Sequence, residues 1–280
     1  MQDSTQLPQD LGIKIAAAIQ GFLYTNDHHF VRSKISLAKN TISFLRAGTK
    51  EVIGDGQAVK INNDQFILMK SGNCLMTEKA SETDTIYRST LLFFSDELVI
   101  DFLERNHLYT NEKSNRHSFY VFKYDYFLGH FAESIENILK LPTPTQEKIL
   151  RAKFEELMLY LCHLYGASFL NTLIQRVDDT AQRLINIVEH NKYNKLSLPE
   201  LSFLANMSLS TFKREFFKQY HTTPIKWFSE KRLEHVALLL RAHKKRPIDL
   251  YEEAGYENFS NFVQAFKKKF GVTPKQYQVQ

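Results

Sequence analysis

The sequence of 280 residues contains only two cysteines, Cys74 and Cys162, and they lie far apart. Their number and spacing exclude a disulfide framework and the paired-cysteine spacing of a structural zinc site. No apolar run reaches the ~18 residues that a membrane-spanning helix needs. The polar residues 1–10 lack the pattern of a secretory signal. We therefore expect a protein of the reducing cytoplasm with no membrane partner.

Catalytic signatures are also missing. The sequence has no G-x-S-x-G, no H-E-x-x-H and no phosphate-binding loop, and Gly54-Asp55-Gly56 is interpreted as a turn. His28-His29 is the one candidate metal feature. Adjacent residues of a strand point to opposite faces, and further ligands at matching spacing are absent. We expect no enzyme activity, no metal and no cofactor.

The charge is unevenly distributed along the chain. Residues 176–280 contain 18 Lys and Arg against 11 Asp and Glu, a net +7, whereas residues 1–175 contain 18 against 20, a net −2. A basic C-terminal segment beside a slightly acidic one indicates a polyanionic partner for the former, although charge that only keeps a surface soluble is an equal alternative.

The chain from about residue 21 to residue 94 is rich in short β-prone segments. We expect strands at 30–37, 42–46, 66–69 and 86–94, separated by turn formers such as Asn62-Asn63-Asp64. This spacing is typical of a small barrel or sandwich. A ligand pocket inside it would be lined by four apolar candidates: Phe44, Phe66, Leu68 and Phe93.

Helices are predicted to follow at 96–108, 125–140 and 146–164. Phe127, Phe131 and Ile135 recur at helical spacing, and Pro142 and Pro144 separate the last two helices. These two should form an antiparallel hairpin, which either packs on the β-rich domain or forms a homodimer interface through 128–165. The predicted domains are a β-barrel regulatory domain (1–127), a helical hairpin (128–175) and a DNA-binding domain (176–280).

An internal repeat governs the C-terminal segment. When it is shifted by 50 residues, Ser210 falls on Ser260, Phe212 on Phe262 and Phe216 on Phe266, and Thr223-Pro224 falls on Thr273-Pro274. The shared pattern is S-x-F-x3-F-x-K-x-[YF]-x2-T-P-x2-[WY]. Agreement at this many spaced positions indicates two copies of one structural element.

Each copy is predicted to be a helix, a turn and a second helix. In the first copy the helices are 198–205 and 209–220, the turn is Asn206-Met207 and Ser208 caps the second helix. In the second copy the first helix is 249–254, Gly255 allows the turn and Asn258 caps helix 259–270. This is the helix-turn-helix arrangement in which the second helix enters the major groove of DNA.

The phenylalanines of helices 209–220 and 259–270 should face the core and leave polar residues exposed. Arg and Lys suit guanine, and Asn and Gln suit adenine. We therefore predict base contacts by Ser210, Lys213, Arg214, Asn261 and Gln264. Phosphate contacts, which strengthen binding without reading sequence, are predicted for Thr211, Lys218, Arg246, Ser260, Lys267 and Lys268. For any single residue, an ordinary solvated face is the alternative.

One long helix, 224–241, should connect the two copies. Phe228, Leu233, Val236 and Leu240 give it an apolar stripe. A rigid connection would place the two readers in successive major grooves on one face of DNA, about 34 Å apart.

The C-terminal ~100 residues resemble the AraC/XylS family of transcription regulators. The resemblance is carried by SLSTFKREF (208–216), TPIKWFSEKRLEHVALLL (223–240), GYENFSNFVQAFKKKFGVTP (255–274) and Gln276-Tyr277. The first segment is most similar to the branch that includes ExsA-type activators. Tyr251 departs from the family, which usually has a small Ala there, so local packing must differ.

This resemblance implies a regulator that binds double-stranded promoter DNA and usually activates transcription by contacting RNA polymerase. It also implies a cupin-like N-terminal β-barrel that senses a signal, either a small-molecule effector or a regulatory protein. The expected fold is therefore α+β, with an N-terminal barrel and hairpin and an all-α C-terminal double helix-turn-helix. The alternatives are a cupin-type metal enzyme fused to a DNA-binding tail and a nonspecific DNA binder.

Overall fold

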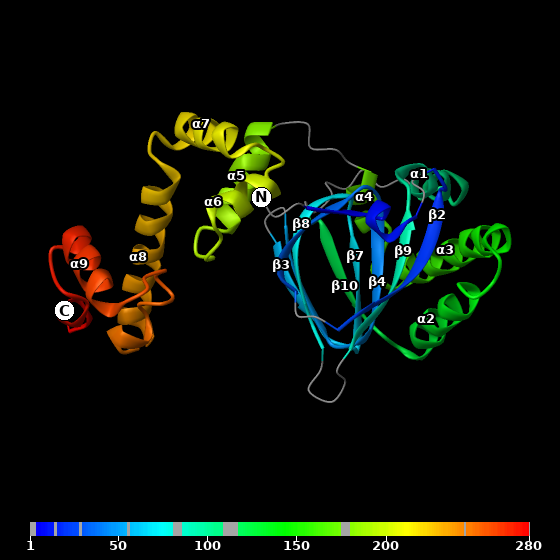
Figure 1. The fold of residues 1–280 in the computed structure, drawn as a ribbon, viewed down its shortest axis with the longest axis horizontal. Helices are drawn as coiled ribbons and strands as arrows, with labels where there is room; N and C mark the ends of the chain where they lie inside the picture. Colours follow the sequence, from blue (N-terminus) through cyan, green and yellow to red (C-terminus); the bar gives the residue numbers. More distant parts are fainter. Residues whose placement is uncertain are drawn as a thin grey trace. The chain divides into compact units, whose positions relative to one another are not determined.

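The protein folds into two compact units, Met1–Asp178 and Asp179–Gln280, each of which is described by itself (Figure 1). The computed structural model describes residues 4–13, 16–27, 30–54, 57–80, 86–108, 117–174, 180–243 and 245–279. Unit 1 combines strands and helices and unit 2 is helical, which confirms the predicted α+β class. His28-His29 and the Asp55-Gly56 part of the predicted turn lie outside the described residues.

Unit 1 is built on two five-stranded sheets that face each other (Figure 1). One has the order β1-β3-β8-β5-β6, with strands β1 (Thr5–Leu7), β3 (Phe30–Leu37), β8 (Gly72–Lys79), β5 (Thr49–Gly54) and β6 (Gln57–Ile61). The other has the order β10-β7-β4-β9-β2, with strands β10 (Phe119–Lys123), β7 (Gln65–Met69), β4 (Asn40–Ala47), β9 (Tyr87–Phe94) and β2 (Ile19–Asn26). Within the described residues no strand pairing joins the two sheets, so the architecture is a sandwich rather than a closed barrel.

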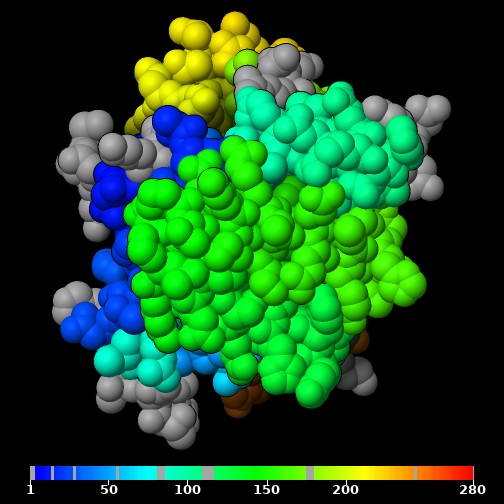
Figure 2. Space-filling model, turned by 90° about the vertical axis from the view of Figure 1, so that its right-hand side faces the viewer, coloured from blue at the N-terminus to red at the C-terminus, as the bar shows by residue number. Residues whose placement is uncertain are grey.

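Four helices cover the outer face of the β4-containing sheet: α1 (Asp96–Arg105), α2 (Tyr126–Ile138), α3 (Thr143–Tyr165) and α4 (Ser168–Ile174). In Figure 2 the green surface of α2 and α3 occupies the middle of the face turned to the viewer. The predicted hairpin is therefore present, and its inner side packs on the sheet. Helix α3 begins at Thr143, earlier than predicted, because Pro144 is tolerated in a first helical turn.

The side chains of the β4-containing sheet serve two cores, because successive residues of a strand point to opposite faces. Inward side chains such as Leu45, Ile67 and Met69 pack between the sheets together with Val52 and Met76. Outward side chains pack under the helices, among them Ile42, Phe44, Phe66, Leu68 and Leu92. Both faces of this sheet are consequently buried, so β4, β7 and β9 are buried along almost their whole lengths, polar residues included.

A cavity of about 200 Å³ lies between the sheets. Its walls are mainly apolar, and the short N-terminal elements β1 and η1 (Gln9–Leu11) contribute Leu7 and Leu11. The predicted lining is wrong for Phe44, Phe66 and Leu68, which belong to the core under the helices. Phe93 pairs across from Thr41 on the inward side and is fully buried, but it does not line the cavity either.

A buried ion pair borders this cavity. Lys50 of β5 is 2% exposed, and its Nζ lies 3.2 Å from Oε1 of Glu78 on β8 and donates a hydrogen bond to Ser43 Oγ across the sandwich. Burial opposes the charge on Lys50, but the neighbouring Tyr87 and Glu78 outweigh it and raise the pKa of Lys50 above its ordinary value. The Lys50 ammonium therefore stays charged. The Glu78 carboxylate offsets the cost of burying this charge inside the sandwich.

Unit 2 consists of α5 (Thr180–His190), α6 (Leu198–Leu204), α7 (Leu209–Tyr220), α8 (Pro224–His243), η2 (Pro247–Asp249), α9 (Phe259–Phe270) and α10 (Pro274–Gln278). The long α8 separates the pair α6 and α7 from η2 and α9 (Figure 1). The predicted helices 209–220 and 259–270 are confirmed, and those at 198–205 and 224–241 are confirmed to within two residues.

The predicted helix 249–254 is wrong. Its place is taken by the 3-10 helix η2 and a series of turns, in which the Ala254 N–H donates to Leu250 and the Gly255 N–H to Glu252. Pro247 and Gly255, which has φ +82°, bound this segment closely. So short a stretch forms few i to i−4 bonds to offset the cost of helix nucleation. Tyr251, the residue that departs from the family pattern, lies here with its ring 6.3 Å from that of Phe259.

Glu78→Ala should destabilise unit 1 by about 3–5 kcal/mol, because it leaves the Lys50 ammonium buried without its carboxylate. The double variant Lys50→Met with Glu78→Leu should recover most of this loss, since an apolar pair of similar volume replaces the ion pair. Urea unfolding of the full chain measures the free energy of unfolding. As a control, Glu147→Ala breaks the exposed Arg151–Glu147 pair and should cost at most about 0.5 kcal/mol. A single-variant loss as small as that of the control would contradict the assignment.

Candidate nucleic-acid interface

Helices α7 and α9 are held in place by matching sets of aromatic rings. Around Phe216, the centroid distances are 4.5 Å to Tyr220 and 5.8 Å to Trp227. Fifty residues later, Phe266 lies 4.5 Å from Phe270 and 5.4 Å from Tyr277. The interplanar angles of the second pair in each set agree, at 80° and 79°. The sequence repeat is therefore a repeat of core geometry.

Both helices begin with the predicted cap. The Ser208 side chain accepts a hydrogen bond from the Thr211 N–H at 3.1 Å, and the Asn258 side chain accepts one from the Asn261 N–H at 2.9 Å. These bonds satisfy backbone donors that a helix leaves free at its first turn. The capped N-terminal half is the part of such a helix that approaches base edges.

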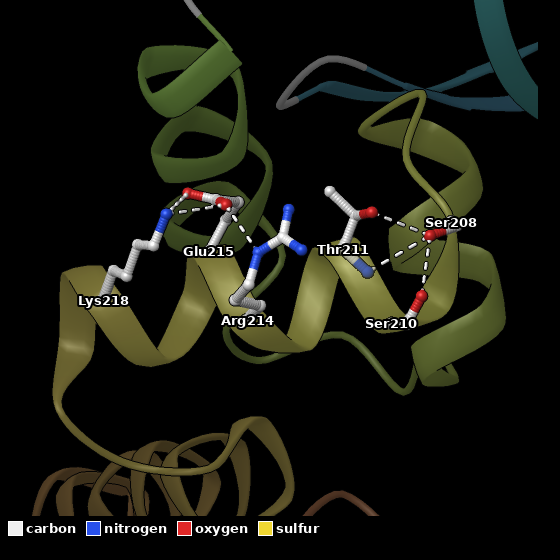
Figure 3. A network of polar contacts seen from close by, with 6 residues as sticks. All are labelled: Ser208, Ser210, Thr211, Arg214, Glu215 and Lys218. Carbon is white, nitrogen blue, oxygen red and sulfur yellow. Dashed lines mark hydrogen bonds and ion pairs between the residues drawn. The ribbon is translucent and has the colours of Figure 1, made fainter.

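The polar face of α7 is exposed as predicted. Ser210, Lys213, Arg214 and Lys218 are exposed and Thr211 is half-buried. Figure 3 shows a hydroxyl cluster at the start of the helix, where Ser208 Oγ lies 3.0 Å from Ser210 Oγ and donates to Thr211 Oγ1 at 2.8 Å. At this end of the helix the hydroxyls can donate hydrogen bonds to phosphates, and they can donate to or accept from base edges.

Glu215 organises the second half of the same face. Its carboxylate accepts from Lys218 Nζ at 3.0 and 3.2 Å and from Arg214 Nε at 3.1 Å (Figure 3). These hydrogen bonds, from Lys218 first and Arg214 second, hold the pKa of Glu215 below its ordinary value. Lys213, by contrast, makes no side-chain hydrogen bond or ion pair within the described part of the chain.

The polar face of α9 is also exposed, and it is chemically different from that of α7. Ser260, Asn261, Gln264, Lys267 and Lys268 are all exposed. No carboxylate lies among them, because the residue fifty positions after Glu215 is Ala265. This face therefore combines amides, which can bond adenine through two contacts, with cations at the C-terminal end of the helix.

Arg246 is exposed, but its guanidinium is already hydrogen-bonded within the protein. Its Nε and Nη2 donate to the two carboxylate oxygens of Asp249, both at 2.9 Å. This pair holds the pKa of Asp249 below its ordinary value. The predicted phosphate contact would require Arg246 to exchange this carboxylate for a phosphate. Lys244, its neighbour in sequence, lies outside the described residues.

Helix α8 fixes the second reader through polar contacts that the sequence did not reveal. Arg232 Nε donates to the Ala254 carbonyl at 3.1 Å, and Ser229 Oγ lies 3.1 Å from Tyr256 Oη. Glu234 bridges two lysines, Lys231 on its own helix and Lys269 on α9, each at 3.0 Å. A Cβ on Gly255 would lie 3.0 Å from Arg232 Nε and would push the guanidinium aside slightly, and the positive φ of this residue independently favours glycine.

Two apolar residues at the readers' N-terminal ends were also missed. Leu209 and Phe259 are the first residues of α7 and α9 and are 37% and 36% exposed. Apolar side chains at such positions can contact the methyl group of thymine. The fifty-residue shift, which pairs Leu209 with Phe259, is the signal that could have identified them.

Within the residues that the structure describes, no three His, Cys, Asp or Glu side chains are grouped so that they could hold a metal ion. No helix in that part of the chain has the length and apolar character that crossing a membrane requires.

Family models match both units. Residues 40–172 match the ExsA N-terminal regulatory domain, and residues 201–280 match a helix-turn-helix domain. The chain is 30% identical over 148 residues to the virulence regulon transcriptional activator VirF of Yersinia enterocolitica, a match that covers 52% of this chain and 55% of that protein. It is 32% identical over 123 residues to the transcriptional regulator ExsA of Pseudomonas aeruginosa, with 44% of each chain covered. The chain thus spans about half the length of the curated relatives that it matches.

Among solved structures, apo ToxT K231A from Vibrio cholerae is similar over 94% of this chain and 97% of that one, with a TM-score of 0.43 and 13% identity. The domain models and the sequence matches all indicate a transcription regulator with a helix-turn-helix domain. The repeated geometry of α7 and α9 agrees with this assignment. By these matches, residues 40–172 are a regulatory domain of the ExsA N-terminal type and residues 201–280 are a helix-turn-helix domain of the type found in AraC-family transcription regulators.

Proposed function

We propose that the protein is a sequence-specific DNA-binding regulator that activates transcription, with α7 and α9 as its two reading helices. One observation carries this proposal. Two helices with the same core geometry and the same kind of N-terminal cap each turn a polar face outward. Nothing in the core requires those polar residues, whereas base edges and phosphates supply partners for all of them.

The length of α8 supports binding to successive grooves. Its 20 residues span ~30 Å at the rise of an α-helix, which is close to the ~34 Å of one DNA turn. The first reader packs on the start of α8 through Phe228, whereas the second contacts α8 along its length, from Ser229 to Leu240. In this proposal α8, together with the packing of α7 and α9 on it, holds the two readers at a separation that suits successive grooves on one face of the duplex.

The two readers are assigned different bases. Lys213 and Arg214, with Ser210, read guanine in one groove, whereas Asn261 and Gln264 read adenine in the next. Thr211, Lys218, Ser260, Lys267 and Lys268 contact phosphates, and Arg246 joins them by leaving Asp249. Promoter DNA as the target places this action in the cytoplasm, beside RNA polymerase.

Unit 1 receives the regulatory signal in this proposal. Its cavity of about 200 Å³ is smaller than the ~300–1,000 Å³ typical of sites for drug-sized ligands. A small-molecule effector would have to be small and largely apolar, so we favour a regulatory protein or a second subunit acting on the outer surface. Stabilisation of unit 1 by a compound in a thermal-shift screen would favour the effector instead.

The outer surface of the α2–α3 hairpin is the proposed homodimer interface. Tyr126 and Phe127 on α2 are 85% and 37% exposed, and Leu159 and Tyr165 on α3 are 46% and 52% exposed. Tyr126 and Leu159 are not part of the core of unit 1, whereas Tyr165 contacts the core residue Phe122 and Phe127 stacks on Tyr160 with only part of each ring covered. Large apolar groups gathered on one face are typical of interaction surfaces.

The full chain should select a defined sequence from random double-stranded DNA, and its affinity should fall steeply with salt. Each phosphate neutralised contributes about −0.9 to the slope of log affinity against log salt concentration. Electrophoretic mobility shifts at several salt concentrations, with the selected and a scrambled fragment, measure both. Binding without sequence preference at every salt concentration would refute specific recognition and leave a nonspecific DNA binder.

Lys213→Ala and Gln264→Ala should weaken recognition of different parts of the selected sequence. Each should cost about 1–3 kcal/mol of discrimination at its own base pair and little at the other, because the readers occupy separate grooves. Binding to fragments with single base-pair changes, measured for each variant, tests this. Lys226→Ala, an exposed lysine on α8, is the matched control for a lost positive charge. Equal losses on specific and random DNA would show that Lys213 contacts only phosphate.

Leu159→Lys should weaken self-association of the full chain by placing a charge in the proposed apolar interface. Sedimentation equilibrium measures the monomer–dimer constant, which we expect to shift at least about tenfold, since burying an unpaired charge is costly. Leu238→Lys on α8, at 63% exposed, is the control and should leave it unchanged. An unaltered constant in Leu159→Lys would exclude this face as the interface.

A further inference from the structure

The carboxylate of Glu215 lies between two cations that face DNA in the proposed function. Arg214 and Lys218 have exposed fractions of 66% and 60%, yet both are tied to Glu215, which is only 23% exposed (Figure 3). Long exposed side chains normally sample many rotamers, and a link to a less exposed neighbour removes part of that freedom. Arg214 is therefore held in one region of space before any DNA arrives.

The atom by which Arg214 is held determines what remains available. Nε donates to Glu215 Oε1 at 3.1 Å, and neither Nη1 nor Nη2 takes part in that bond. A guanidinium can bond the O6 and N7 of guanine through two parallel N–H donors. With Nε occupied, the pair of donors that is left is the outer edge formed by Nη1 and Nη2. Glu215 thus selects one of the two ways in which an arginine can approach guanine.

The second reader has no such device. The residues fifty positions after Arg214, Glu215 and Lys218 are Gln264, Ala265 and Lys268. A glutamine stands at the reading position in place of the arginine, and the alanine next to it provides no acceptor. The carboxylate therefore accompanies the arginine and is not part of the repeated framework of the fold.

We propose that Glu215 is a positioning residue that fixes Arg214 for end-on recognition of a single guanine and lowers affinity for DNA that lacks it. This inference rests on the proposed function. The second effect follows from charge: the carboxylate neutralises Lys218 and repels phosphates, so it weakens contacts that do not depend on sequence. Loss of Glu215 then raises nonspecific binding while it relaxes the choice of base.

The test replaces guanine by 7-deazaguanine, which lacks the N7 acceptor but keeps base pairing. Full-length protein first selects its binding sequence from random DNA, and each guanine of that sequence is then replaced in turn. In the wild type, one guanine should lose about 5- to 100-fold in affinity on replacement. In Glu215→Ala, the loss at that guanine should fall below about threefold. Binding to scrambled DNA should become stronger, with a salt slope steeper by about one.

Two further variants keep the result interpretable. Glu230→Ala removes a carboxylate that pairs with Lys226 on α8, and it should retain the full sensitivity to 7-deazaguanine. Glu215→Gln keeps the side-chain volume but not the charge, and it should lie between wild type and Glu215→Ala; it replaces the alanine variant if that one melts early. Equal sensitivity of wild type and both Glu215 variants at the same guanine overturns the proposal.

Failure of the proposed function looks different. If no sequence is enriched from random DNA, specific recognition itself is refuted. If a sequence is enriched but no guanine responds to 7-deazaguanine in the wild type, the role of Arg214 and its positioning by Glu215 are wrong, while the double reader stands.

Discussion

The contact of two aromatic clusters with α8 is the interaction on which the DNA-binding unit depends. A reading helix has polar side chains over about half of its surface, so the other half must supply all of its attachment. In α7 and α9 that attachment is a fully buried pair of phenylalanines at i and i+4, extended by one ring on the same helix and one on the next. Because α8 continues from one cluster to the other, it transmits the position of the first reader to the second.

The polar contacts of unit 2 add direction to this apolar attachment. Arg232 binds the Ala254 carbonyl just before the turn at Gly255, and Lys269 joins α9 to Glu234 on α8. Apolar packing alone tolerates small rotations, whereas a hydrogen bond of fixed geometry does not. The second helix-turn-helix, whose first element is a 3-10 helix followed by turns, is therefore held from α8 as well as from within.

The net charge of +7 of the C-terminal segment does not show which of its cations are already paired with carboxylates. Arg214 and Lys218 share Glu215, and Arg246 is bound to Asp249, so several cations enter the interface already paired. Lys213, Lys267 and Lys268 have no such partners within the described part of the chain. A paired cation must exchange one anion for another when it meets phosphate, which gives less affinity than a free cation but more dependence on geometry.

The sequence by itself determined the DNA-binding unit almost completely. A fifty-residue repeat of phenylalanines, caps and Thr-Pro pairs specifies local helices and their buried faces, and these depend on contacts close in sequence. It failed at 249–254, where a short segment between Pro247 and Gly255 is shaped by its packing against α8. It also missed the contacts of Glu215, because these depend on the rotamers of Arg214 and Lys218.

In unit 1 the tertiary structure decided more. The alternation of side chains was masked because both faces of the β4-containing sheet are buried, so the sequence could not tell inward from outward residues. Phe44, Phe66 and Leu68 consequently faced the helices instead of the cavity. The Lys50–Glu78 pair joins residues from two strands whose partnership arises only through long-range pairing. The sequence determines the local periodicity of each strand or helix. The elements that pack on a sheet decide which of its faces is covered, and this depends on the tertiary structure.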